Sequence, residues 1–282
     1  MFQFLIDLQH YSFLQYALIT GILASIACGV IGTYVVVRGI SYMAGGISHT
    51  VLGGIGAALY FKTVQGWSWI NPIYGAVVTA LLAALLIGVV SLRAKQRIDT
   101  VISALWAVGM AGGVLFLSRT PGYATDLMSY LFGNILMVTP GDLWLLAGLD
   151  AIIVFLGLVC YNQFLAVCFD DEFARVRGLH VDVYYLLLLC LTALTVVLLV
   201  TVVGLIMVIA LLTLPIAIAG VFSNALWRMM LLSAIFSALF TTGGLVVSYV
   251  LDYPAGATTI LLAGAAYLLT VTGMRILHRQ EA

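Results

Sequence analysis

Two ionisable side chains, His49 and Asp150, lie within long apolar stretches of this 282-residue sequence. An ionisable residue inside a hydrophobic span is costly, and by default it marks a pathway or a binding site. A neutral imidazole binds ions such as Zn²⁺ and Mn²⁺, and its protonation weakens that binding as pH falls. Together with Ser48 and a few further oxygens, one histidine would hold a cation weakly enough to release it, as transport requires.

Each of these side chains has a plainer interpretation. His49 could be a structural histidine that is bonded to a neighbouring helix. Asp150 could cap a helix or form a local hydrogen bond without touching any cargo. The other histidines, His10, His180 and His278, lie near the ends of apolar runs or in the tail, which favours interfacial positions.

The segment that carries His49 is rich in small residues. Residues 38–60 read RGISYMAGGISHTVLGGIGAALY, an apolar run with six glycines, five of which lie within seven residues of the histidine. Small residues let the backbones of neighbouring membrane helices approach closely. The run therefore predicts a tightly packed span that holds His49 beside a path for a small polar substrate.

The composition indicates an integral membrane protein. Hydrophobic residues make up 64% of the chain and charged residues only 8%, against about 25% charged in a soluble domain. Long apolar runs separated by short polar loops predict an all-α, polytopic helical bundle, embedded in lipid, rather than a barrel. The formal net charge is zero, so nothing favours nucleic-acid binding. The four cysteines lack a metal-binding spacing and are interpreted as small core residues.

The apolar runs predict about nine spans, within a range of eight to ten, and one re-entrant segment, in a single domain that covers residues 1–282. We expect Asp99 and Thr100 to cap the fourth span, and Asp142 to cap the fifth. Residues 162–183 are interpreted as a polar block. The expected spans are 13–37, 43–60, 71 to the basic cluster 93–97, 101–118, 143–161, 184–203, 205–221, 229–250 and 257–276, and the re-entrant segment is 129–138.

The basic residues predict the orientation. The cluster at 93–97 belongs in the cytoplasm, because cytoplasmic loops are enriched in lysine and arginine. That choice leaves only Lys62 and Arg119 outside, of eleven lysines and arginines in the chain. It also predicts a cytoplasmic C-terminus.

Residues 169–179 hold a second informative stretch. Acidic residues come first and arginines follow, which complements a helix dipole, and Gly178 can end the helix. The pattern predicts a cytoplasmic helix of about two turns, which is either a docking site for a partner or a solvated loop whose charges set the topology. The chain has no nucleotide-binding GxxxxGK[ST] loop, and no GxSxG or HExxH motif. We therefore expect a transporter rather than an enzyme, driven by a partner chain or by an ion gradient.

Several stretches together resemble one family. DDEFARVRGL is similar to the coupling helix of ABC-transporter permeases, in the form found in zinc and manganese importers of the ABC-3 family. RGISYMAGGISHTVLGG resembles that family's second-helix motif, and LFGNIL resembles a further stretch. GLIMVIALLTLPIAIAG, with Gly204 and Pro215, and DYPAGA, with Asp252, Pro254 and Gly256, resemble its later signatures. These matches run in family order from about residue 38 to residue 256.

The resemblance implies a permease of a bacterial plasma membrane that works as a homodimer or as a pair. It implies Zn²⁺, Mn²⁺ or Fe²⁺ as transported cargo, with no permanently bound cofactor. It also implies an extracytoplasmic substrate-binding protein that delivers the metal. Cytoplasmic ATPase subunits would dock on the segment that contains Asp170, Asp171, Glu172, Ala174, Arg175 and Gly178.

One position departs from the family pattern. The family usually has an aspartate four residues before the histidine, where this chain has Gly45. Residues four apart share a helix face, so that pair could bind one cation. We hypothesise that Asp150 supplies the missing oxygen near His49. Two alternatives remain open: a permease of the same class for a chelated or non-metal cargo, and an ion-coupled secondary transporter, which would show more buried carboxylates and paired broken helices.

Overall fold

The computed structural model describes the backbone of residues 2–93, 97–121, 133 and 138–280, and every regular element in these ranges is a helix. The predicted all-α class is therefore confirmed. The helices are α1 (Phe2–His10), α2 (Ser12–Arg38), α3 (Ser41–Thr63), α4 (Pro72–Arg93), α5 (Ile98–Ser118), α7 (Pro140–Val159), α8 (Tyr161–Phe169), α9 (Asp171–Val176), α10 (Val181–Val203), α11 (Leu205–Phe222), α12 (Leu226–Leu251) and α13 (Ala255–Gln280).

The chain is a multi-pass membrane protein by the length and apolarity of its helices. Seven of the described helices are long and apolar enough to cross a membrane, namely α2, α4, α5, α10, α11, α12 and α13. An eighth is counted if α7 and α8, which meet at a bend of 68°, form one broken span. The prediction of several spans is confirmed, and the count of nine stays a prediction.

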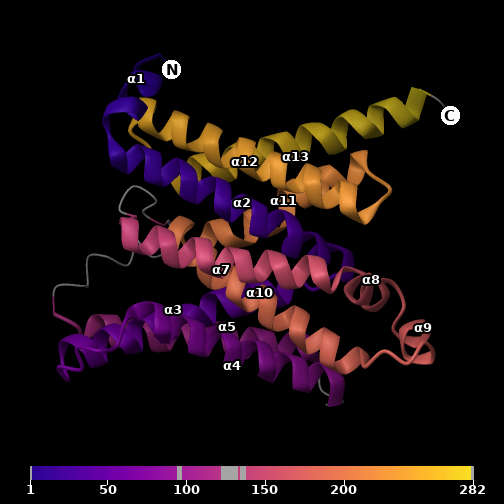
Figure 1. Ribbon diagram of the computed structural model, residues 1–282, viewed down its shortest axis with the longest axis horizontal. Helices are drawn as coiled ribbons and strands as arrows, with labels where there is room; N and C mark the ends of the chain where they lie inside the picture. Colours follow the sequence, from indigo (N-terminus) through magenta and orange to yellow (C-terminus); the bar gives the residue numbers. More distant parts are fainter. Residues whose placement is uncertain (1, 94–96, 122–132, 134–137, 281–282) are drawn as a thin grey trace.

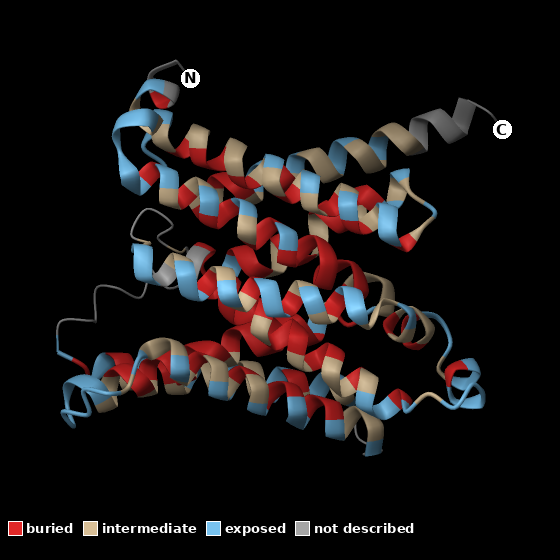
Figure 2. Ribbon diagram, in the orientation of Figure 1, coloured by how far each residue is buried: buried red, intermediate tan, exposed pale blue. Residues whose placement is uncertain are grey.

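The helices form layers that run in similar directions (Figure 1). One outer layer contains α3, α4 and α5, the other contains α11, α12 and α13, and α2, α7 and α10 lie between them. Buried residues concentrate toward the middle of this arrangement (Figure 2). Within its most apolar window α2 is 72% buried, whereas α5 and α13 are each 17% buried. The outer helices therefore offer apolar faces to lipid or to a partner.

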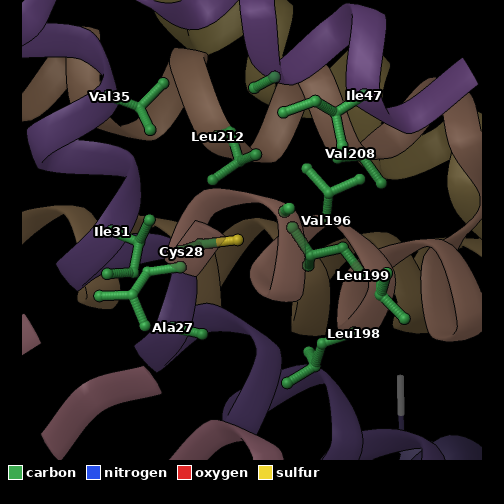
Figure 3. Packing of buried hydrophobic residues seen from close by; sticks show 14 of the residues in the cluster. Ala27, Cys28, Ile31, Val35, Ile47, Val196, Leu198, Leu199, Val208 and Leu212 are labelled. Atoms are coloured by element: carbon green, nitrogen blue, oxygen red, sulfur yellow. The ribbon is translucent and has the colours of Figure 1, made fainter. Parts of the chain in front are cut away.

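The core lies where α2, α10 and α11 meet. Cys28 of α2 points toward Val196 of α10, Leu212 of α11 lies nearby, and Ile47 of α3 lies beside Val208 of α11 (Figure 3). All five side chains are at most 1% exposed. This apolar centre packs α11 against the helix that carries His49.

Helix α3 touches both of its neighbours through glycines. A Cβ atom added at Gly54 would lie 2.2 Å from the carbonyl oxygen of Gly75 on α4. A Cβ atom added at Gly56 would lie 2.7 Å from the carbonyl oxygen of Gly113 on α5. Such distances leave no room for a side chain, so the backbones themselves are in contact. The predicted close packing of this segment is confirmed.

Two predicted boundaries are wrong. Helix α5 begins at Ile98 with Arg97 at the cap position, so Asp99 and Thr100 lie inside its first turn. Asp99 still lies at the positive end of the helix dipole, which explains why it resembled a cap. The polar block predicted to begin at residue 162 begins later, because α8 occupies residues 161–169 and buries Phe164.

Some predictions fall outside the described residues. The re-entrant segment and the LFGNIL stretch lie there, apart from Gly133 and residue 138, and the Asp142 side chain is not described; α7 begins at Pro140. Gly133 has φ +75°, and an added Cβ atom would lie 2.2 Å from the carbonyl carbon of Val203. Gly133 therefore presses on the break between α10 and α11, where Gly204 has φ +84°.

Candidate functional site

His49 is buried in the first half of α3, with 8% of its surface exposed. Its ring stacks on the Trp106 indole of α5, with the ring centroids 4.1 Å apart and the planes 12° from parallel. Its Nδ1 atom is buried and has no hydrogen-bond partner among the described residues. Within the described residues, Nδ1 therefore does not bond His49 to a neighbouring helix. The orphaned nitrogen is therefore available to a ligand or to water.

Trp106 continues into a row of aromatic and polar side chains between α3 and α5. The Tyr42 ring lies 6.3 Å from the Trp106 indole, and the Tyr42 hydroxyl is 2.8 Å from the Ser103 hydroxyl. Tyr42 is 46% exposed. The row thus connects the buried imidazole with the surface of the chain on the face where α3 meets α5.

Gly45 faces the same tryptophan as His49. A Cβ atom added at Gly45 would lie 3.3 Å from Cδ1 of Ile209 and 3.9 Å from Cζ3 of Trp106. These are the ends of side chains rather than backbone atoms, so a small side chain could be accommodated after a slight shift. Positions 45 and 49 therefore share one face of α3, as their spacing predicts.

Ser48 is fully buried, and its hydroxyl makes a hydrogen bond within its own helix. Its hydroxyl donates to the carbonyl oxygen of Gly45 at 2.7 Å. A hydroxyl oxygen keeps acceptor capacity after donating, so Ser48 could still offer an oxygen. The observed bond is with its own helix, and a role in binding stays a prediction.

Asp150 lies on α7, is 5% exposed, and packs near Ala27 and Cys28 of α2. Its Oδ1 atom is buried without a hydrogen-bond partner in the described part of the chain. The contacts of His49 are instead with α5. The two side chains are therefore placed on different helix pairs, and a shared cation site between them stays a prediction.

The acidic segment forms the short helix that the sequence predicts. The Asp170 carboxylate accepts a hydrogen bond from the Phe173 backbone N–H at 2.9 Å and caps the start of α9. Gly178 has φ +80°, and the Leu179 N–H donates to the Ala174 carbonyl at 3.1 Å. The Gly178 N–H also donates to the Arg175 carbonyl at 2.9 Å, and these two bonds at the C-terminal end of α9 form the Schellman arrangement that a glycine permits. The predicted cap at Gly178 is confirmed, and the N-terminal cap by Asp170 is a feature that the structure adds.

Helix α9 presents both charge and apolar surface. Within α9, Ala174 is fully buried, whereas Phe173 is 53% exposed and Val176 is 87% exposed. A cavity of about 800 Å³ lies between α8 and α9, lined in part by Gln163, Phe173 and Arg177. Phe173 therefore lies both at the surface of α9 and at the edge of this cavity.

Two ion pairs tie α9 to other elements. Asp171 pairs with Arg38 at 2.6 Å, and Arg175 pairs with Asp182 of α10 at 2.5 Å. Glu172 is exposed and joins neither pair. Asp171 and Arg175 therefore hold α9 against other elements, whereas Glu172 faces outward.

The later motif residues shape helix ends. Gly204 separates α10 from α11, and Pro215 lies buried inside α11. Asp252 has φ +56° at the end of α12, and Pro254 directly precedes α13. Gly256 is buried in the first turn of α13. These residues lie at turns and packing contacts, away from His49 along the chain.

Sequence reasoning missed Trp106, Arg38 and the exposed apolar residues of α9. Trp106 is a lone indole within an apolar span, and nothing local links it to a histidine far away in the chain. Arg38 seemed only to mark the end of a span. The exposed Phe173 and Val176 had a visible signal, because apolar residues in a short charged helix have no core to enter.

Comparisons with known proteins agree with this arrangement. The sequence matches the model of the family described as the ABC 3 transport family over residues 10–273. It is 43% identical over 244 residues to a probable metal transport system membrane protein of Chlamydia pneumoniae, which covers 86% of this chain and 83% of the relative. It is 35% identical over 268 residues to the manganese import system permease protein ScaB of Streptococcus parasanguinis, covering 95% of this chain and 93% of the relative.

A solved structure has the same fold. One chain of PsaBC from Streptococcus pneumoniae in complex with Fab superposes with a TM-score of 0.85 at 33% sequence identity. The similarity covers 95% of this chain and 94% of that chain. The helical arrangement in Figure 1 is therefore shared over nearly the whole length.

Proposed function

This chain belongs to the ABC 3 transport family, and we propose that it moves Mn²⁺, Zn²⁺ or Fe²⁺ into the cell. It is the membrane permease subunit of an ATP-binding-cassette metal importer, and the ATPase is a separate subunit. Support for the choice of metals comes from the names of the relatives and from the donor chemistry of an imidazole. The chain itself is the conduit and performs no catalysis.

The observation that carries the proposal is the buried His49 with its orphaned Nδ1 atom. Leaving a buried nitrogen without a partner costs about 1–3 kcal/mol, and such a group is retained where a ligand uses it. Trp106 covers one face of the ring and holds its orientation. We assign His49 as the path residue that cargo meets, with Ser48 and Asp150 as further path residues.

The proposed topology has nine spans. Helix α3 is 23 residues long and lies between α4 and α5, and α7 with 20 residues is long enough to cross. Adding both to the seven helices that are long and apolar enough to cross a membrane gives nine alternating crossings. Arg38, Arg93 and Arg228 then lie at one end of the bundle with α9, and Lys62 at the other. The end that carries the three arginines and α9 faces the cytoplasm, and the C-terminus lies on the same side.

The proposed partners follow from the surfaces. A cytoplasmic ATPase subunit docks on α9 and the adjacent cavity, contacting Phe173, Glu172 and Val176. A second copy of this chain, or a paired permease, covers part of the apolar outer faces. An extracytoplasmic substrate-binding protein delivers metal at the opposite end, and lipid surrounds the remaining faces.

Gly45 supports an alternative cargo. Without a carboxylate at this position, His49 has no anionic ligand on its own helix face. A metal chelate, which brings its own oxygen ligands, would need fewer protein ligands than a free ion. The same permease architecture would then import a chelated metal, driven by the same ATPase.

The test is the metal content of cells that express the complete transporter. Cells with the wild-type complex are compared with cells that lack the permease and with cells that carry His49→Ala. We expect higher Mn or Zn with the wild type, and loss of that increase in the variant. His10→Ala is the matched control, because His10 is exposed on α1 and its Nδ1 lies 2.9 Å from the Ile6 carbonyl oxygen.

Unchanged Mn, Zn and Fe on removing the permease would overturn the metal cargo. Full metal uptake by the His49→Ala variant would instead show that His49 is not part of the transport path. Flux through the purified permease in liposomes without ATPase or ATP would favour a secondary transporter.

A further inference from the structure

The ion pair between Arg38 and Asp171 joins α9 to the turn that precedes the helix carrying His49. Of the two ion pairs in the described residues, it is the more enclosed, with side-chain exposures of 22% and 39%. The Arg175–Asp182 pair is exposed at 56% and 54% and ties α9 only to α10. Enclosed pairs are less screened by salt and hold their geometry better.

Arg38 lies at a tight turn between α2 and α3. It is the last residue of α2, and Gly39 follows with φ +75°. The Ile40 N–H donates to the Val35 carbonyl at 2.9 Å, and α3 begins at the next residue, Ser41. With only two residues between the helices, a displacement of Arg38 moves the start of α3.

One guanidinium group holds three elements together. Nη1 of Arg38 donates to the Val167 carbonyl at 2.7 Å, in the last turn of α8. Nη2 binds the Asp171 carboxylate at the start of α9, and the group lies over the Tyr185 ring of α10, 5.6 Å from its centroid. The planar fork of arginine makes this set of contacts possible, and lysine could not reproduce it.

The ion pair has a second arrangement open to it. Asp171 Oδ1 is buried and has no hydrogen-bond partner within the described chain. A cavity of about 290 Å³, lined by Arg38, Asp171, Arg175 and Tyr185 among others, adjoins the pair. A small movement of α9 would let both carboxylate oxygens accept from the guanidinium, which is the stronger bidentate geometry.

We infer that Arg38 is a positioning residue that transmits movement of α9 to the α2–α3 turn, and through α3 to His49. The inference rests on the proposed function, because it takes the ATPase to dock on α9. The Asp171 carboxylate receives the displacement, and the guanidinium passes it to the backbone that starts α3. Loss of this contact leaves docking intact and uncouples transport from ATP hydrolysis.

The test uses the complete transporter, with its ATPase and binding protein, in proteoliposomes supplied with Mn²⁺ and, separately, Zn²⁺. Arg38→Gln and Asp171→Asn are compared with wild type for ATPase binding, ATP hydrolysis and metal transported per ATP. We expect normal binding and a drop of about fivefold or more in metal per ATP, the lower end of usual coupling energies. The double variant should fall no further than Arg38→Gln alone, because Asp171→Asn removes only a contact that Arg38→Gln has already removed.

Asp182→Asn is the matched control, because it breaks the other ion pair of α9 and should keep metal per ATP at the wild-type value. Weakened ATPase binding in both test variants would overturn the inference, as would unchanged coupling or an additive loss in the double variant. If Arg38→Gln does not fold, Asp171→Asn alone decides, since it alters a partly exposed side chain. A wild-type complex that transports neither metal would overturn the proposed function instead.

Discussion

Restoring a carboxylate at position 45 would test whether the His49 face of α3 binds a cation. The change is Gly45→Asp, on a helical backbone where glycine has no special conformation. An added Cβ atom would meet Cδ1 of Ile209 at 3.3 Å, and this end of a flexible side chain can shift. The new carboxylate would lie one helical turn from the imidazole, with Cβ atoms about 6 Å apart.

The magnitude follows from the burial of this position. Gly45 is buried, and an uncompensated polar group there costs about 1–3 kcal/mol, or more when charged. The metal-free variant should therefore be less stable than wild type by at least that amount. A divalent cation held by the introduced carboxylate would remove the penalty, so apparent affinity should rise about tenfold for each 1.4 kcal/mol recovered.

The assay is the thermal stability of the purified permease, titrated with Mn²⁺ and Zn²⁺ above the usual imidazole pKa of about 6.5. We expect a larger metal-induced rise in Tm for Gly45→Asp than for wild type. Gly45→Asn is the matched control, with the same shape and no charge. The gain should vanish when His49→Ala is combined with Gly45→Asp. Equal metal responses in the aspartate and asparagine variants would refute a shared cation at these positions.

Three further predictions follow from packing and caps. Gly54→Ala should destabilise the permease by more than about 2 kcal/mol, because the added Cβ atom would lie 2.2 Å from a backbone oxygen of α4; Gly112→Ala, in open space, is the control in thermal unfolding. Asp170→Ala should remove the α9 cap, worth about 1 kcal/mol, and weaken ATPase binding about fivefold, as measured by titration of the purified subunits. Asp150→Asn should lower metal uptake as His49→Ala does while stability is kept; lost stability with full uptake would give Asp150 a structural role only.

Much of the fold could be predicted because spans and caps are local. The apolar run that starts near residue 13 became α2, and the run that starts at residue 205 became α11, each within a few residues of the predicted bounds. The C-terminal cap of α9 followed from Gly178, and its acidic first turn indicated where the helix begins. Helix α8 was not predicted because its first turn contains the polar residues Asn162 and Gln163, which are also common in loops.

The site could be predicted only one residue at a time. His49 stood out as an ionisable side chain in an apolar run, but its stacking on Trp106 joins two helices and depends on how they cross. The Arg38–Asp171 pair joins residues 133 positions apart, so no local pattern could indicate it. Asp150 shows the same limit, since burial in a span was expected and its neighbours on α2 were not.

The glycine contacts of α3 restrict how this permease can move. Where Gly54 meets Gly75 and Gly56 meets Gly113, main chains lie against each other without intervening side chains. Sliding or rolling of α3 against α4 or α5 would drive Cβ atoms of the adjacent turns into these contacts. The three helices should therefore travel as one rigid slab, carrying His49 and Trp106 together. Opening to either side of the membrane must then occur at the borders of this unit, where α4 and α3 meet α10 and where α3 meets α11 through flexible side chains such as Ile209.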